Sequence, residues 1–242
     1  LGAEKEKVRG NLLRAISHDI RTPLTSIMGA SSALLENAGE ISTEEQKKLV
    51  SGIYEEAQWL LRMVENLLSV TRIDEEYRGD IQKTEEPAEE IIAEAVAKFK
   101  KRYPQEEVKV HIPQEYIQVS VDPILIEQVL INLLENVVHH ARNATDITVE
   151  LRREGDKAVF EVADNGEGIK QDVLPYLFSK EFNYRTEDSG DNRRNMGIGL
   201  SVCQTIVKVH GGTISVKNKK KPEHGAVFGF SLPAVKAETP EI

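Results

Sequence analysis

The sequence predicts an α+β protein in which a helical hairpin precedes a domain built on a mixed sheet. Two observations predict this class. Residues 4–37 and 42–74 both repeat apolar side chains at helical spacing, and only an Asn-Ala-Gly break at 37–39 separates them. From residue 85 onward, short apolar strands and amphipathic helices alternate without the regular spacing of βαβ units, which favours a mixed sheet with helices on one face.

The two helices of the hairpin carry broad apolar surfaces. The second begins near Ser42, whose hydroxyl can cap it, and the acidic residues that follow suit a helix N-terminus. Its apolar positions are Leu49, Val50, Ile53, Ala57, Leu60, Leu61, Val64, Leu67 and Leu68. One hairpin offers too little partner surface to bury them, whereas two copies would form a four-helix bundle. We therefore expect a homodimer.

The rest of the chain divides into a linker, a second domain and a tail. The segment 77–87 is interpreted as the linker and the first strand of the second domain. The predicted helices of that domain are 88–102, 123–140 and 199–210, and its further predicted strands are 108–111, 117–120, 147–153, 158–163, 212–217 and 226–232. The segment 166–196 is rich in loop residues. The predicted organisation is thus a helical hairpin at 1–76, a linker at 77–84, a second domain at 85–233 and a mobile tail at 234–242.

Composition limits the partners and the compartment. The net charge of −9 over 242 residues argues against nucleic-acid binding, which needs clustered Lys and Arg. The single cysteine, Cys203, cannot form an intrachain disulfide and favours a reducing, cytoplasmic compartment. There is no long apolar run, no signal peptide and no initiator Met, so we expect a cytoplasmic fragment whose missing N-terminal region could hold membrane spans.

The first chemical signal is the heptapeptide SHDIRTP at residues 17–23. His18 lies about 180° from the centre of the apolar stripe of its helix and should therefore face water. Asp19 is close enough to accept an imidazole proton. An isolated His-Asp pair on a charged helix is more often an ordinary surface feature, so its interpretation depends on the second domain.

The second domain carries four features that fit a nucleotide site. Asn132 and Asn136 lie on an apolar helix, where an amide oxygen suits Mg²⁺. The run Asp-Asn-Gly-Glu-Gly at 164–168 follows a strand, and the glycines at 197 and 199 open a helix whose N-terminus suits phosphate. A polar segment at 180–196 could form a lid. Each feature alone has an ordinary explanation, such as a polar helix edge or a turn, but their combination indicates a nucleotide site.

These motifs, in this order, resemble those of the catalytic core of bacterial two-component sensor histidine kinases. SHDIRTP is similar to the phosphoacceptor box, INLLENVVHHA to the N box, DNGEG to the first glycine box, LFSKEFNYR to the phenylalanine box and MGIGL to the second glycine box. The resemblance covers residues 4–233. More narrowly, SHDIRTPLTSIMG, QVLINLLENVV and GGTISV are most similar to sensor kinases that control high-affinity potassium uptake.

The resemblance implies a protein-histidine kinase that phosphorylates His18 from ATP and transfers the phosphate to an aspartate in the receiver domain of a response regulator. Asp19 would orient and deprotonate the imidazole. Thr22 would position the water that dephosphorylates the regulator. The implied second domain is the α/β sandwich ATPase of the histidine-kinase and Hsp90-like superfamily.

The resemblance also implies a binding site for ATP and Mg²⁺. Asn136 would bind Mg²⁺, Asp164 would accept the adenine amine, and the backbone near Gly197 and Gly199 would receive phosphates. The full set of implied binding residues is Asn132, Asn136, His139, His140, Asp164, Gly166, Gly168, Gly197, Ile198, Gly199 and Leu200.

Three positions depart from the family pattern. His139 and His140 stand where the family often has Lys and Tyr, and Asn195 replaces the first glycine of the second glycine box. A neutral histidine supplies less charge than lysine, so the departures leave open a dimeric nucleotide-binding scaffold with a degenerate kinase reaction. A conformational ATPase of the chaperone or mismatch-repair kind is a further alternative. The two histidines form a poor metal pair, because adjacent helical residues point about 100° apart.

Overall fold

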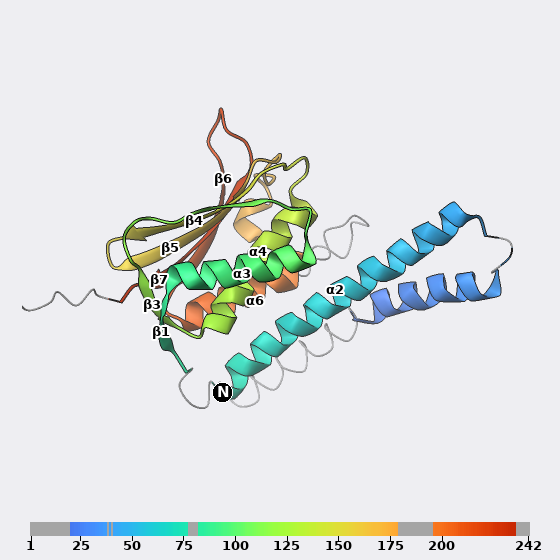
Figure 1. Cartoon of the computed structure of the whole chain (residues 1–242), viewed down its shortest axis with the longest axis horizontal. Coiled ribbons are helices and arrows are strands. Elements are labelled where there is room, and N and C mark those ends of the chain that lie inside the picture. The colour runs from blue at the N-terminus through green and yellow to red at the C-terminus, as the bar shows by residue number, and fades with distance from the viewer. Residues whose placement is uncertain (1–19, 38, 40, 77–81, 179–195, 236–242) are drawn as a thin grey trace, which may run out of the picture. The chain divides into compact units, whose positions relative to one another are not determined.

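The computed structural model describes residues 20–37, 39, 41–76, 82–178 and 196–235 (Figure 1). The chain divides into two compact units, Leu1–Leu67 and Leu68–Ile242. The domain bounds inferred from the sequence stay predictions. Among the helices in the described ranges, none has the length and apolar character needed to cross a bilayer.

The first unit is a helical hairpin. Residues 20–36 are helical, and α2 (Thr43–Glu76) follows after a short turn (Figure 1). A capping box starts α2: the Ser42 N–H donates to Glu45 Oε2 at 3.1 Å, and the Glu45 N–H donates to Ser42 Oγ at 3.3 Å. The hydrogen bonds from Ser42 lower the pKa of the Glu45 carboxyl. The predicted start of the second helix is therefore confirmed at the level of individual hydrogen bonds.

Two apolar stripes run along α2. Leu49, Ile53 and Leu60 are half-buried and Met63 is buried. The second stripe is exposed, with Val50 at 55%, Tyr54 at 63%, Leu61 at 54% and Val64 at 44% of full exposure. The second stripe has the spacing of a helix–helix seam and remains open to solvent in the single chain.

The second unit is an α/β sandwich that contains a mixed sheet and a small accessory sheet. Its elements are β1 (Thr84–Pro87), α3 (Ala88–Arg102), β2 (Val108–His111), β3 (Gln118–Val121), α4 (Pro123–His140), β4 (Ile147–Glu154), β5 (Lys157–Asp164), the 3₁₀ helix η1 (Leu174–Tyr176), α6 (Met196–Val209), β6 (Thr213–Asn218) and β7 (Ala226–Pro233). The five-stranded sheet has the order β2-β4-β5-β7-β6, and only its β2–β4 pair is parallel. β1 and β3 form a separate antiparallel pair. The α+β class and the mixed sheet are confirmed.

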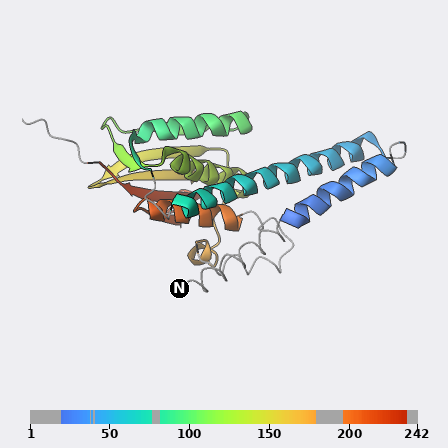
Figure 2. The ribbon, with the colours of Figure 1, turned by 90° about the horizontal axis from the view of Figure 1, so that it is seen from below.

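Helices α3, α4 and α6 cover one face of the five-stranded sheet (Figures 1 and 2). The strands alternate as a half-buried sheet requires, and Phe160 of β5 stacks on Phe230 of β7 with ring centroids 4.7 Å apart. α4 contributes Leu130, Leu133 and Leu134, each no more than 1% exposed. The core therefore lies between this helical layer and the sheet.

The structure refines the predicted bounds of several elements by one to three residues. The helix predicted to begin at residue 199 begins at Met196, and the strand predicted at 117–120 is shifted to Gln118–Val121. The 3₁₀ helix η1 interrupts the segment predicted to be loop. The pairing of β1 with β3 was not predicted, because each strand has four residues and the contact joins distant parts of the chain.

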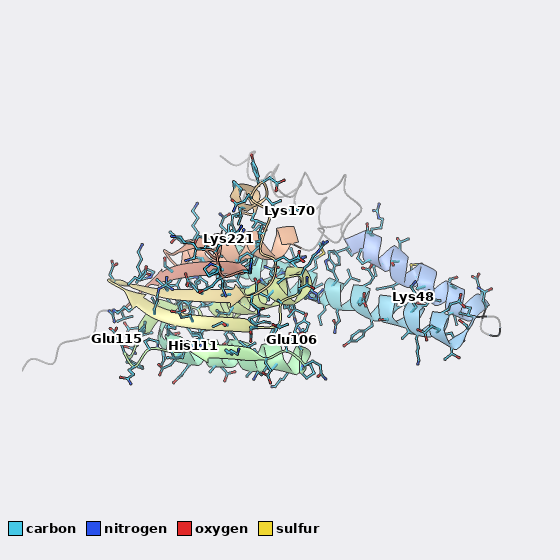
Figure 3. The ribbon with its side chains drawn as sticks, turned by 90° about the horizontal axis from the view of Figure 1, so that it is seen from above. Lys48, Glu106, His111, Glu115, Lys170 and Lys221 are labelled. Carbon is cyan, nitrogen blue, oxygen red and sulfur yellow. The ribbon has the colours of Figure 1, made fainter. Side chains whose placement is uncertain are left out.

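The outer face of the sheet carries a charged cluster centred on Glu161 of β5. Figure 3 views this side, with His111 on the edge strand β2 and Lys221 in the turn after β6. The Glu161 carboxylate accepts from Arg152 Nη1 at 2.8 Å and from Lys217 Nζ at 3.1 Å. Although partial burial opposes them, these two cations lower the pKa of Glu161 from its ordinary value of 4.5.

This cluster predicts a specific dependence of stability on pH. Because the folded-state pKa of Glu161 lies below its unfolded value, its pairing stabilises the fold at neutral pH, and that stabilisation is lost as the pH falls through the folded-state pKa. Glu161→Gln should lower the free energy of unfolding by about 1 kcal/mol near neutral pH, and by progressively less in acid. Urea denaturation over a pH series measures this. Glu150→Gln, which alters an exposed carboxylate on the neighbouring strand, should show no such loss, and an equal loss in both variants would contradict the prediction.

Candidate functional site

The start of α4 is fixed by its N-cap. The Asp122 carboxylate accepts from the N–H groups of Ile124 at 3.0 Å and Leu125 at 3.3 Å, and Pro123 occupies the first helical turn. The Asp122 N–H in turn donates to His210 Nε2, at the end of α6, at 3.0 Å. These contacts set where α4 begins, and so which of its residues face inward.

Asn132 and Asn136 are both buried on α4, at 4% and 8% exposure, but their amides differ. Asn132 accepts from Gln128 Nε2 at 3.2 Å and also hydrogen-bonds the Cys203 thiol of α6. Asn136 Nδ2 is buried and has no hydrogen-bond partner among the described residues. An unsatisfied buried donor lowers the free energy of unfolding by about 1–3 kcal/mol. A ligand that accepts a hydrogen bond from Asn136 Nδ2 would remove this cost, so Asn136 is the candidate ligand-binding residue on α4.

α4 and α6 run antiparallel beside each other. Asp122 at the start of α4 meets His210 at the end of α6, and midway the Cys203 thiol lies 3.8 Å from the Val129 carbonyl oxygen. Burial raises the pKa of this thiol to about 12, which keeps it protonated. Extending both antiparallel helices by one turn from the Asn132–Cys203 contact leads to Asn136 on α4 and to Gly199 near the start of α6.

Asp164 ends β5 and is 2% exposed. Its Oδ1 accepts from the Gly166 N–H at 2.8 Å, and its Oδ2 accepts from the Ala226 N–H of β7 at 3.3 Å. The two hydrogen bonds orient the carboxylate. A carboxylate held in this way can accept a further hydrogen bond from an amine.

Glycines make the loop after Asp164 possible. A Cβ on Gly166 would lie 2.7 Å from the Arg142 carbonyl oxygen, and a Cβ on Gly225 would lie 1.9 Å from the Asp164 carbonyl oxygen. Gly168 has φ of +76°, in the left-handed region. The loop therefore packs against backbone on two sides, at distances that a side chain would prevent.

Side chains that the sequence prediction did not select hold this loop in place. The Asn218 amide pairs with the Ile169 backbone, accepting from its N–H at 2.8 Å and donating to its carbonyl at 2.6 Å. Asn165 Oδ1 accepts from the N–H groups of Thr145 at 2.8 Å and Asp146 at 3.0 Å. The available signal was their residue type, since an Asn side chain can mimic a peptide group. Their partners are distant in sequence and could not be inferred.

The end of α4 is tied to α3. The Tyr103 hydroxyl lies 3.0 Å from His139 Nε2, and the two rings meet edge to face with centroids 5.8 Å apart. Arg102 Nη1 donates to the buried carboxylate of Glu135 at 2.6 Å. The structure thus gives His139 a partner at the residue that follows α3, and the expected contacts of His139 and His140 with nucleotide stay predictions.

Several predicted residues fall in or beside the undescribed segments. His18, Asp19 and residues 180–195, which hold Asn195 and all of the predicted lid but its last residue, lie outside the described residues. Thr22 is an exposed residue of the first helix. Gly197 and Ile198 are in the first turn of α6, as is Gly199, while the Leu200 side chain is fully buried in the core. Within the described ranges, His, Cys, Asp and Glu form no group of three that could hold a metal ion.

Two family models match different parts of the chain. Residues 8–76 match the His Kinase A (phospho-acceptor) domain, and residues 121–236 match the histidine kinase-, DNA gyrase B- and HSP90-like ATPase. The chain belongs to the histidine kinases. It combines the phosphoacceptor and ATPase modules of a sensor kinase core in the order predicted from its motifs.

Relatives and solved structures agree with this family. The kinase core is 43% identical to Sensor protein KdpD of Clostridium acetobutylicum over 95% of this chain and 34% identical to Sensor protein KdpD of Escherichia coli over 96%, which supports the narrower resemblance. It spans 25% of the length of each. The catalytic domain of histidine kinase ThkA is 27% identical, covering 63% of this chain and 96% of that one, with a TM-score of 0.52. A structure of ThkA with the response regulator protein TrrA matches in fold with a TM-score of 0.67, at 24% identity, over 96% of this chain and 64% of that one.

The close packing at Gly225 predicts losses of stability of different size for two glycine substitutions in the kinase core. Gly225→Ala should cost about 3 kcal/mol or more, because the new methyl group would overlap the Asp164 backbone. Gly155→Ala is the matched control: Gly155 also has positive φ, but nothing lies within 4 Å of its Cβ position, so only backbone strain of about 1 kcal/mol is expected. Urea denaturation compares them. Equal denaturation midpoints for the two variants would contradict the prediction, because they would show that overlap with the Asp164 backbone adds no loss of stability.

Proposed function

We propose that this chain autophosphorylates His18 with ATP and passes the phosphate to an aspartate of a response regulator. The observation that carries the proposal is the buried Asn136 amide, whose Nδ2 has no hydrogen-bond partner among the described residues. Helix N-termini favour phosphate, and the oriented Asp164 carboxylate can receive an adenine amine. These groups together suit a nucleoside triphosphate that contains adenine.

The residues present fit Mg²⁺ bound together with the nucleotide. The Asn136 amide supplies one neutral oxygen ligand and one nitrogen donor, so its oxygen can face the ion while its Nδ2 donates to a phosphate. Mg²⁺ needs few protein ligands when phosphates and water supply the rest. When bound, the ion would neutralise charge on the phosphates.

The reaction itself is proposed to proceed at His18. Its Nε2 bonds to the γ-phosphorus while the bond from that phosphorus to the bridging oxygen breaks, and ADP leaves. Asp19 orients the imidazole and takes up its Nδ1 proton. The phosphoryl group then moves from Nε2 to a carboxylate oxygen of the regulator. Thr22, four residues after His18 in the sequence, is proposed to position the water that later removes the phosphate from the regulator.

The partners follow from the hairpin and from the relatives. The exposed stripe of α2 is proposed to pair with a second copy, which completes a four-helix bundle. The response regulator is proposed from the module pairing, and the complex of ThkA with TrrA supports it. Because the matched relatives are longer, the whole protein is proposed to be a sensor whose kinase core lies in the cytoplasm and whose membrane contact lies in another region.

Labelling with γ-labelled ATP and Mg²⁺ tests the kinase proposal. The wild-type chain should acquire acid-labile, base-stable phosphate, and His18→Gln should acquire none. His111→Gln changes an exposed histidine on β2 and should be labelled like the wild type. Adding receiver domains one at a time should then remove label from the chain. A wild-type chain that binds ATP in calorimetry without forming phosphohistidine would instead support the degenerate scaffold.

The dimer proposal predicts that a charge in the exposed stripe separates the copies. Leu61→Glu should convert the dimer to monomer in analytical ultracentrifugation, because a carboxylate is costly to bury without a partner. Tyr116→Glu is the control, since Tyr116 is as exposed, at 56%, but lies between β2 and β3. A wild-type chain that sediments as a monomer would contradict the proposal.

A further inference from the structure

His210 is a buried histidine with a fixed proton arrangement. It follows α6 and is 2% exposed. Its Nδ1 lies 2.7 Å from the Ile206 carbonyl oxygen, so this nitrogen must carry the proton. Its Nε2 lies 3.0 Å from the Asp122 amide nitrogen, so it must offer a lone pair to that N–H. The ring is therefore neutral and in one tautomer.

The surroundings of His210 hold the ring in this place. Gly211 has φ of +75°, and a Cβ on Gly212 would lie 2.1 Å from the Ser231 carbonyl oxygen, so the chain turns sharply against β7. The charged groups that face the ring are Lys83, which donates to the Val209 carbonyl at 3.3 Å, and Asp122. Burial lowers the pKa of His210 and the charge of Lys83 adds to this, whereas the hydrogen bond to the Ile206 carbonyl and the charge of Asp122 oppose the shift.

His210 joins the two helices on which the candidate nucleotide site depends. Its contact with Asp122 links the end of α6 to the start of α4. Asn136 lies about 21 Å further along α4, at the usual rise per residue. Because a helix barely shortens along its axis, a shift of α4 at Asp122 reaches Asn136 almost unchanged. The same hydrogen bond fixes the end of α6 against α4. It therefore also affects where the start of α6, which would receive phosphate, lies along α4.

We propose that His210 is a positioning residue for nucleotide binding, which sets the axial register of α4 against α6 through the Asp122 N–H. This inference rests on the proposed function and adds a residue to it that touches neither nucleotide nor metal. Misplacement of binding groups by about 1 Å can cost about 10²-fold in activity. The neutral ring is required, because a protonated Nε2 would place an N–H against the Asp122 N–H.

Two substitutions separate the acceptor at Nε2 from its titration. His210→Gln keeps a polar acceptor that does not titrate, and His210→Leu removes the acceptor. Affinity for ATP with Mg²⁺ is measured by calorimetry on the full chain between about pH 8 and about pH 5.5, a range that spans the ordinary histidine pKa. The ligand's own titration is common to all variants. Ile206→Val is the control for stability alone, since it deletes a buried methyl group on α6 and keeps the carbonyl.

At about pH 8, His210→Leu should bind ATP at least about tenfold more weakly than the wild type, while His210→Gln and Ile206→Val bind within about threefold of it. As the pH falls, wild-type affinity should decline more steeply than that of His210→Gln. His111→Gln and His224→Gln, which alter exposed histidines, should keep the wild-type profile.

The inference is overturned if His210→Leu binds ATP as tightly as the wild type. It is also overturned if His210→Gln keeps the full wild-type pH dependence, or if Ile206→Val weakens binding as much as His210→Leu. Each of these results leaves the proposed kinase function intact. A wild-type chain that binds no ATP at any pH would contradict both.

Discussion

The placement of α4 is the constraint on which the rest of the second unit depends. This helix is buried between α3, α6 and the sheet, so its rotation and its position along its own axis are both fixed by packing. The ion pair between Arg102 on α3 and Glu135 fixes the rotation of α4 about its axis. The hydrogen bond between Asp122 and His210 fixes the position of its first residues. The residue beside Glu135 is Asn136, whose amide nitrogen is left unsatisfied within the described chain. A helix with so little freedom can present one polar group at a defined place.

The sequence was sufficient for the elements and for the class of fold, because the apolar periodicity along this chain is strong. The 3.6-residue repeat of α4 and the alternation in β5 leave one face each for the core, and the elements were found within a few residues. The start of α2 was also readable, since Ser42 and Glu45 cap it locally. The pairing of strands that are distant in the sequence could not be predicted from the local pattern. β1 and β3 have four residues each, and nothing in such short strands identifies the partner with which each of them pairs.

The candidate site also contains residues that the sequence identified and residues that it did not. Asp164 and Asn136 were recognisable because their motifs are local, and both are buried where the motifs place them. Asn218, Gly225 and Tyr103 were not recognisable, because their importance comes from neighbours far along the chain. The chemistry of a site can be encoded in short motifs, whereas its rigidity depends on tertiary contacts that leave little trace in the local sequence.

The turn between β6 and β7 shows how such rigidity limits change. At one end of the turn, the Asn218 side chain forms two hydrogen bonds with the backbone of Ile169. At the other end, Gly225 packs on the backbone of Asp164, so both ends of the turn contact the loop that follows Asp164. Between them, residues 220–224 are exposed. The tip can therefore accept inserted sequence while its two bases cannot be moved apart. Variation in the length of this turn is therefore expected at residues 220–224, without any change in the contacts of Asn218 and Gly225.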